Sequence, residues 1–443
     1  MRDIVLALFI FGTIPFILSR PYVGLLVWSW IGYMNPHKLC YGFAVTFPWV
    51  QLIAIVTLIS FAVSKESKKI PMSAVSVLLF VFLAWTGLTT IFAVEPASAW
   101  EKWQETAKIM VMVFVTLMMV KSRQRMDWLV WVIVISIGFF GLKGGVFTIL
   151  RGGNYHVYGP ARSFIADNND LAQAFCMVLP LMRYLQLQVV KRWQRISMGT
   201  LMALTGVATL GTYSRGGLIA LVVVGGALIL KSRRQVTLVV VLIAVAATAY
   251  HFMPAQWLER MDTLHHAEQV NSLQTRIQSW EFATNVAVHR PVLGGGFDVY
   301  ENASMWATYG PDGARQRAIH SIYFRVLGEQ GFPGLLLFLG LLAASWRSCS
   351  KVRAMSKNSP EDKWAFDLAA MLQVSLLAFI VAGAATTSSY FDLSFQLMAM
   401  CVLLKHILEA NGSGLRVPDV AAATPRSPRL GGSAQTATGH RTR

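Results

Sequence analysis

The chain is dominated by a series of long apolar runs, and these runs limit its possible fold more than any other feature. Several of them approach or exceed the roughly 18 apolar residues that cross a hydrocarbon core as a helix. They show none of the residue-by-residue alternation typical of a membrane β-barrel. We therefore predict an all-α polytopic membrane protein with about 12 transmembrane helices, or 13 if each run crosses once. The runs lie at about 4–18, 21–34, 48–63, 72–92, 107–120, 128–150, 170–189, 196–212, 216–230, 236–252, 332–346, 365–385 and 389–408.

Composition supports lipid as the solvent of this chain. Of its 443 residues, 55% are hydrophobic and only 14% are charged, and its mean hydropathy of +0.50 is too high for an ordinary soluble protein. The net charge of +17 could indicate nucleic-acid binding. However, the lysines and arginines fall in short blocks between apolar runs, which is a topology signal, so we predict no nucleic-acid partner.

The basic blocks predict the orientation of the chain. If each run crosses once, every block lies on the same side, which the positive-inside rule makes the cytoplasm of a bacterial inner membrane. The opposite, periplasmic side then receives the loops near 35–47, 93–106, 151–169, 211–215, 253–331 and 386–389. The N-terminus reads as an uncleaved signal anchor, and its side stays open because the first two runs could form one broken helix.

Four regions follow from this pattern. Residues 1–252 form N-terminal transmembrane helices, and residues 253–331 form one long periplasmic loop, or lobe, with an amphipathic helix of its own. Residues 332–410 return to the membrane. Residues 411–443 have a composition typical of a disordered tail, which we place in the cytoplasm.

Arginines on the outer face are unusual, because the positive-inside rule leaves few there. Arg215 is the most prominent, since it opens an apolar run among the small residues of 211–217. An arginine at this place often only snorkels to the interface. Its planar guanidinium can also grip two phosphate oxygens at once. The outer candidates are Arg151, Arg162, Arg215, Arg276, Arg290, Arg315, Arg317 and Arg325.

His320 is the candidate general base, although a lone histidine beside an apolar run is more often a packed residue. Its case rests on spacing: nine residues separate His320-Ser321 from Gly331, and Gly334 follows. Asp167 looks like a helix N-cap. The glycines of 294–296 fit no nucleotide-binding motif and indicate a tight turn.

The cysteines and carboxylates predict neither a disulfide framework nor a metal site. The four cysteines are widely spaced, without a CxxC pair. The outer loops contain no Asp-x-Asp or His-rich cluster. We therefore expect no cofactor.

Together these motifs resemble the O-antigen ligase and polymerase superfamily, over roughly residues 150–345. The His-Ser-x9-Gly-x-x-Gly spacing is the most specific part, and it favours ligase over polymerase. An N-terminal region is similar to the exosortase-associated O-glycosylation ligases, a branch proposed to glycosylate proteins. The segments that carry the resemblance are Tyr213-Ser214-Arg215-Gly216-Gly217, Arg276 with Trp280 ahead of 291–297, His320-Ser321 ahead of 331–334, 159–162 with 168–172, and, for the branch, 20–24 with 34–37.

The resemblance implies a metal-independent glycosyltransferase of GT-C-like architecture. Its donor would be a glycan on undecaprenyl diphosphate and its acceptor a sugar hydroxyl of lipid A-core, which completes lipopolysaccharide. His320 would remove the acceptor proton, while Arg215, Arg276 and Arg162 would stabilise the leaving diphosphate. The alternatives are an O-linked protein glycosylation ligase, an O-antigen polymerase and, less favoured, a transporter of the lipid-linked glycan.

Overall fold

The computed structural model describes residues 1–231 and 269–412, and all regular structure in those ranges is helical. Short 3-10 turns separate some of the α-helices. The α-helices are α1 (Arg2–Ser19), α2 (Pro21–Met34), α3 (Trp49–Val63), α4 (Ala74–Ile91), α5 (Pro96–Met119), α6 (Arg123–Leu150), α7 (Asn168–Gln188), α8 (Arg192–Gly211), α9 (Arg215–Leu230), α12 (Gln269–His289), α13 (Ala303–Tyr309), α14 (Ile322–Ser356), α15 (Lys363–Gly383) and α16 (Asp392–Gly412).

Every predicted apolar run within the described ranges coincides with one of these helices. The run at 236–252, the start of the lobe up to residue 268 and the tail from residue 413 lie outside the described residues. By length and hydropathy, α1, α4, α6, α14, α15 and α16 can cross a membrane, among the helices that the structure describes. The chain is therefore a multi-pass membrane protein. The total of 12 or 13 spans stays a prediction.

Local sequence signals define where several helices begin. The hydroxyls of Ser73, Ser122 and Ser214 each accept a hydrogen bond from a backbone N–H in the first turn of α4, α6 and α9. The carboxylate of Asp167 does the same for α7, as its position in the sequence predicts. Pro96 occupies the first turn of α5, where its missing N–H costs nothing.

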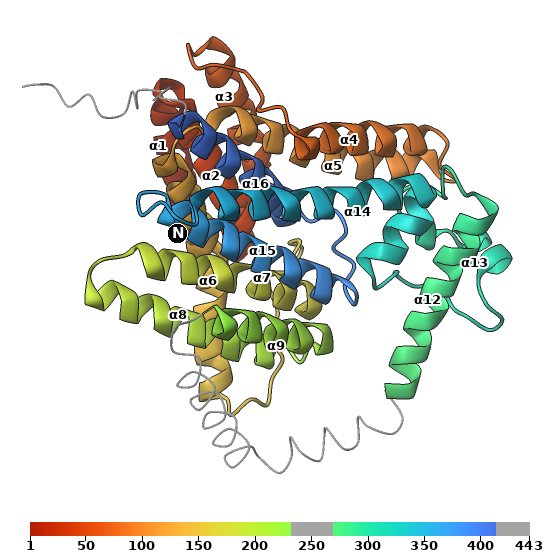
Figure 1. The fold of residues 1–443 in the computed structure, drawn as a ribbon. Helices are drawn as coiled ribbons and strands as arrows, with labels where there is room; N and C mark the ends of the chain where they lie inside the picture. The colour runs from red at the N-terminus through yellow and green to blue at the C-terminus, as the bar shows by residue number, and fades with distance from the viewer. Residues whose placement is uncertain (232–268, 413–443) are drawn as a thin grey trace, which may run out of the picture.

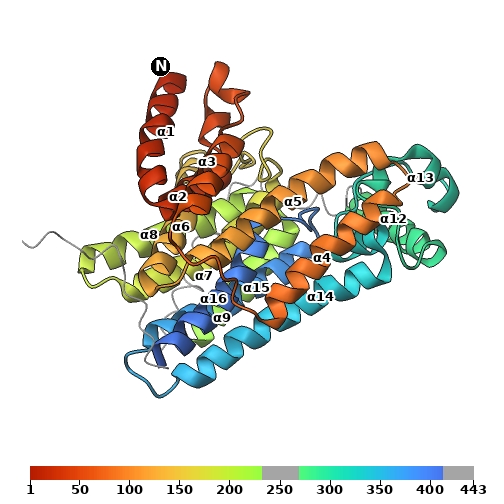
Figure 2. The same cartoon turned by 90° about the horizontal axis from the view of Figure 1, so that it is seen from above.

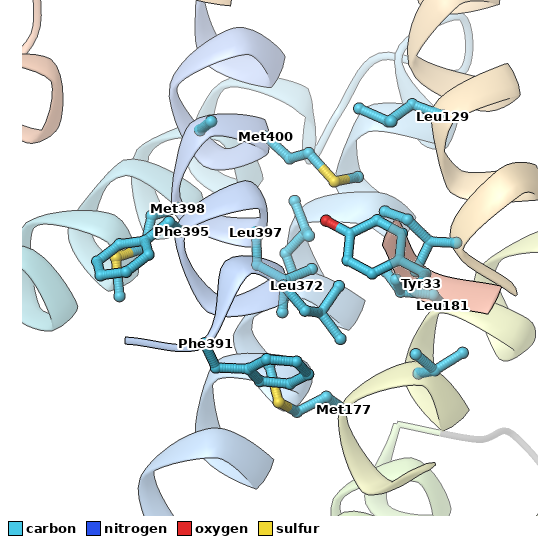
Figure 3. Close-up of a cluster of buried hydrophobic side chains, with 14 of the residues drawn as sticks. Tyr33, Leu129, Met177, Leu181, Leu372, Phe391, Phe395, Leu397, Met398 and Met400 are labelled. Carbon is cyan, nitrogen blue, oxygen red and sulfur yellow. The ribbon is translucent and has the colours of Figure 1, made fainter. Parts of the chain in front are cut away.

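The centre of the bundle is formed by α7 and α16. Of the apolar window in α16, 78% is buried inside the protein, compared with 17% in α1. Most side chains of α1 are therefore exposed on the outside of the bundle, whereas α16 is surrounded by other helices. Figure 3 shows part of this core, where Phe391, Leu397 and Met400 meet Tyr33 and Met177.

The loops gather at two ends of the bundle. Near α12 and α13, which project beyond the other helices in Figures 1 and 2, backbone bonds join Val94 to Gly295. We call this the lobe end. At the other end, the guanidinium of Arg125 pairs with Glu66 at 2.8 Å, and Arg353 donates to Gln373. The two basic blocks that contain Arg125 and Arg353 thus belong to this second end.

Candidate active site

A kink in α14 shapes the lobe end. Gly331 adopts φ +69°, and a Cβ there would overlap the carbonyl oxygen of Val292, so only glycine fits. The kink leaves carbonyls of the preceding turn without helical partners. The backbone N–H groups of Gly295 and Gly296 donate to the carbonyls of Gly328 and Glu329, at 2.8 and 2.9 Å. The predicted tight turn is confirmed, and it completes the hydrogen bonding of a broken helix.

The helix that contains the kink begins earlier than the sequence predicted. The sequence placed the return to the membrane at residue 332, whereas α14 already begins at Ile322. Residues 322–330 form a separate helical segment ahead of the kink. This segment holds Arg325 and Glu329 four residues apart, which places both on one helical face.

Arg325 is buried at the centre of an ion network. Its Nε donates to Glu329 Oε1 at 2.9 Å and its Nη2 donates to Asp298 Oδ1 at 2.7 Å. Its third nitrogen, Nη1, donates to the carbonyl of Thr387 at 2.8 Å. The rings of Tyr300 and Tyr390 lie 5.1 and 5.7 Å from the guanidinium. We call Arg325, Asp298, Glu329, Tyr300 and Tyr390 the Arg325 network.

This network corrects one sequence-based candidate and adds residues that the sequence analysis missed. Arg325 was one of the outer arginines considered for phosphate binding, but all three of its nitrogens are used inside the protein. Asp298, Glu329 and Tyr390 were not considered. The spacing of Arg325 and Glu329 was a readable signal, but the partners Asp298 and Tyr390 come from distant segments that only the fold brings together.

His320 immediately precedes this segment and is half-buried. Trp280 of α12 donates through its indole Nε1 to the carbonyl of His320 at 3.3 Å, and its ring stacks on Phe324 at 5.2 Å. Burial lowers the pKa of His320, and the positive charges of Arg276 and Arg325 lower it further, while Asp167 opposes them. The neutral imidazole, which is the form that can accept a proton, is therefore favoured.

Arg215 opens α9 and is exposed. Two contacts to α7 fix its turn: Asn168 Nδ2 donates to the carbonyl of Thr212 at 2.8 Å, and the Ser214 hydroxyl donates to Asn169 Oδ1 at 2.7 Å. A Cβ at Gly217 would overlap that of Ala172. The small residues of this motif thus allow α9 to approach α7 closely.

Arg276, on α12, connects the two sides of the site. Burial lowers its pKa, the charge of Arg215 lowers it further, and Asp167 opposes both. The same Arg276 and Asp167 act on His320. Arg215, Arg276 and His320 therefore share one electrostatic neighbourhood although they come from three distant segments, and we call these three residues the open set.

Arg162 is less closely tied to this set. It is exposed and adopts φ +60° in the loop before α7, and no contact within the described ranges joins it to the open set. Two further outer arginines bond to backbone, since Arg290 donates to the carbonyl of Phe92 at 2.7 Å and Arg317 to that of Arg315. In the described part of the chain, no three His, Cys, Asp or Glu side chains gather as a metal site. All four cysteines are buried free thiols.

Fold and site together define a multi-pass membrane protein with an imidazole and two arginines collected at one end. Residues 200–339 match the family described as O-antigen ligase, and residues 1–190 match a family of unknown function, DUF5935. No curated protein matches the chain. The chain carries an O-antigen ligase domain behind a DUF5935 region, and this domain indicates enzymatic glycan transfer of the ligase or polymerase type. The three members of the open set all lie inside it, whereas Arg162 lies in the DUF5935 region.

Proposed function

We propose that this protein transfers a glycan from undecaprenyl diphosphate to a sugar hydroxyl of lipid A-core, as the last step of lipopolysaccharide assembly. The observation that carries the proposal is the open set. The charge of Arg215 acts on Arg276, the charge of Arg276 acts on His320, and Asp167 acts on both Arg276 and His320. A cationic pair beside a neutral imidazole suits a reaction that deprotonates an alcohol and releases a diphosphate.

In the proposed reaction, His320 accepts the proton of the acceptor hydroxyl. The acceptor oxygen attacks the anomeric carbon of the donor, and the bond from that carbon to the diphosphate oxygen breaks. The electron pair of that bond leaves with undecaprenyl diphosphate. Arg215, Arg276 and Arg162 stabilise the charge that grows on its oxygens, and Arg215 can do so with two parallel hydrogen bonds. This chain uses its own side chains for each of these roles and needs no cofactor, consistent with a GT-C-like, metal-independent transferase.

The reaction requires the lobe end to face the periplasm of a bacterial inner membrane. The opposite end carries basic residues, and the positive-inside rule places such an end in the cytoplasm, which supports this orientation. Ser304 in α13 is exposed and provides a reporter position. Ser304→Cys should react with a membrane-impermeant maleimide in intact spheroplasts, and the native cysteines give a low background because all four are buried. Reaction only after permeabilisation would contradict the orientation and the function with it.

A protein acceptor is the second candidate. The segments at 20–24 and 34–37 resemble the ligase branch proposed to glycosylate proteins, and both lie in the DUF5935 region rather than in the ligase domain. The donor half of the reaction is the same for both acceptors, and also for polymerisation onto a second lipid-linked glycan.

One experiment separates these acceptors. Purified protein is incubated with undecaprenyl-diphosphate glycan and with lipid A-core, a candidate acceptor protein or no added acceptor. A gel shift of lipid A-core alone is the expected result. A shift of the protein would identify the second candidate, and lengthening of the lipid-linked glycan without acceptor would identify a polymerase. Donor that is bound but never consumed would indicate a transporter.

A further inference from the structure

Three aromatic rings form a patch next to Arg215. The imidazole of His156 lies parallel to the ring of Tyr213, with centroids 4.5 Å apart and 20° between the planes. The imidazole of His156 also lies nearly parallel to the ring of Tyr158, with centroids 5.8 Å apart and 15° between the planes. We call His156, Tyr158 and Tyr213 the ring patch.

The rings of His156 and Tyr158 are exposed, whereas that of Tyr213 is half-buried. Tyr158 is 61% exposed although it is large. Rings that serve only to pack would be expected to bury most of their apolar area, because that burial is what stabilises a core. Here the loop presents the rings outward, and its buried side chain is Val157 instead.

The loop holds this arrangement firmly. The backbone N–H of Val157 donates to the carbonyl of Gly211 at 2.8 Å, and the Tyr213 hydroxyl donates to the carbonyl of Gly153. Tyr213 adopts φ +58°, which bulky residues rarely do, and Arg162 adopts φ +60°. Strained residues of this kind gather at functional sites, where the surrounding structure enforces them.

The ring patch is continuous with the proposed diphosphate site. Tyr213 is two residues from Arg215, so their Cα atoms lie within about 7 Å of each other. In a lipid-linked glycan, the first sugar is bonded directly to the diphosphate. A pyranose has an apolar face of C–H groups, which an aromatic ring covers well, and hydroxyls at its rim, which stay in water. An arginine beside exposed aromatic rings thus suits a ligand in which a diphosphate is bonded to a sugar.

We propose that the ring patch binds the sugar residues of the lipid-linked donor that follow the diphosphate. The nature of this lipid rests on the proposed function. The patch contains His156 and Tyr158 of the DUF5935 region and Tyr213 of the ligase domain. Donor recognition is therefore shared by the two regions of the chain. Aromatic side chains at a membrane surface can instead anchor a protein among lipid head groups, and the experiment separates that role from sugar binding.

The test compares two lipids that differ only in the sugar. Full-length protein in detergent is titrated with undecaprenyl diphosphate and with undecaprenyl diphosphate bearing N-acetylglucosamine, and Kd is measured by intrinsic fluorescence or thermophoresis. Tyr158→Ala should weaken binding of the sugar-bearing lipid about 2- to 10-fold, the size of one aromatic contact. It should leave binding of the bare lipid unchanged. Tyr158→Phe keeps the ring and should bind as the native protein does.

Tyr41→Ala is the matched control, because Tyr41 is 87% exposed in the loop between α2 and α3 and lies outside the ring patch. Equal weakening of both lipids by Tyr158→Ala, or no change in either, would overturn the inference even if the native protein transfers glycan. If the native protein binds neither lipid, it is the proposed function that fails.

Discussion

The Arg325 network and the open set lie at the same end of the molecule, and they use arginine in opposite ways. The guanidinium of Arg325 is buried and pairs with Asp298 and Glu329. Arg215 is exposed, and no carboxylate of the described residues pairs with it. A buried guanidinium that is paired with two carboxylates through its own protein is withheld from a substrate. The presence of an arginine at this end therefore does not define its role. Whether its guanidinium is buried and paired with carboxylates separates a structural arginine from one that can bind substrate.

The largest effect is expected in the open set. His320→Ala should lower the rate of glycan transfer about 100- to 10,000-fold, because the acceptor proton loses its base. Donor binding should persist, since the base contacts only the acceptor. Transfer by purified variant and native protein, measured beside the Kd of the donor, checks both statements. Near-normal turnover would make His320 a packing residue and remove it from the open set.

The second effect concerns stability and belongs to the Arg325 network. Arg325→Met should destabilise the fold by about 3–5 kcal/mol, because the buried Glu329 and the partly buried Asp298 are left without their partner. Arg215→Met, at an exposed position, should change stability by no more than about 0.5 kcal/mol. Unfolding in detergent, followed by circular dichroism, compares the two. Similar stability losses in both variants would erase the distinction between the two arginines.

A smaller effect sharpens the role of Arg215. Arg215→Lys keeps the charge but removes the planar fork, so it should lower transfer about 10- to 100-fold, the value of one charge-assisted hydrogen bond. Its stability should stay at the native level. The parallel variant Arg317→Lys alters an outer arginine that bonds only to backbone in the described part of the chain, and its transfer rate should not change. Full activity of Arg215→Lys would show that charge alone suffices there.

The helices were predictable because each depends on its own sequence. Apolar length and hydroxyl or carboxylate caps such as Ser214 and Asp167 act over a few residues, and the structure confirms them. The kink was not predicted, because the spacing to Gly331 marks the motif without showing how the backbone turns there. The early start of α14 at Ile322 was not, because residues 322–330 are stabilised by the turn at 294–296 and not by apolar length.

The site divides in the same way. Arg215 and His320 stand in motifs that a sequence shows directly. Their proximity through Arg276 depends on how α12 packs, and the partners Asp298 and Thr387 of Arg325 come from segments 27 and 62 residues away. Contacts across such separations are set by packing between helices, which no local pattern encodes.

The last prediction concerns the pH at which the open set works. As a base, His320 acts only when deprotonated, so transfer should fall as the pH drops through its pKa. Burial and the charges of Arg276 and Arg325 hold this pKa below the ordinary value of 6.5, so the inflection of the rate profile should lie below pH 6.5. Asp167 acts in the opposite direction. Arg276→Gln should therefore move the inflection to higher pH, and Asp167→Asn should move it to lower pH while still capping α7. Because all three proteins hold a neutral imidazole near pH 8, the two shifts should disappear there, whatever each variant does to the plateau rate. The full pH profile of transfer, measured with donor and acceptor at saturation, checks this. Shifts of the same sign in both variants would mean that the inflection belongs to another group, and the open set would lose its base.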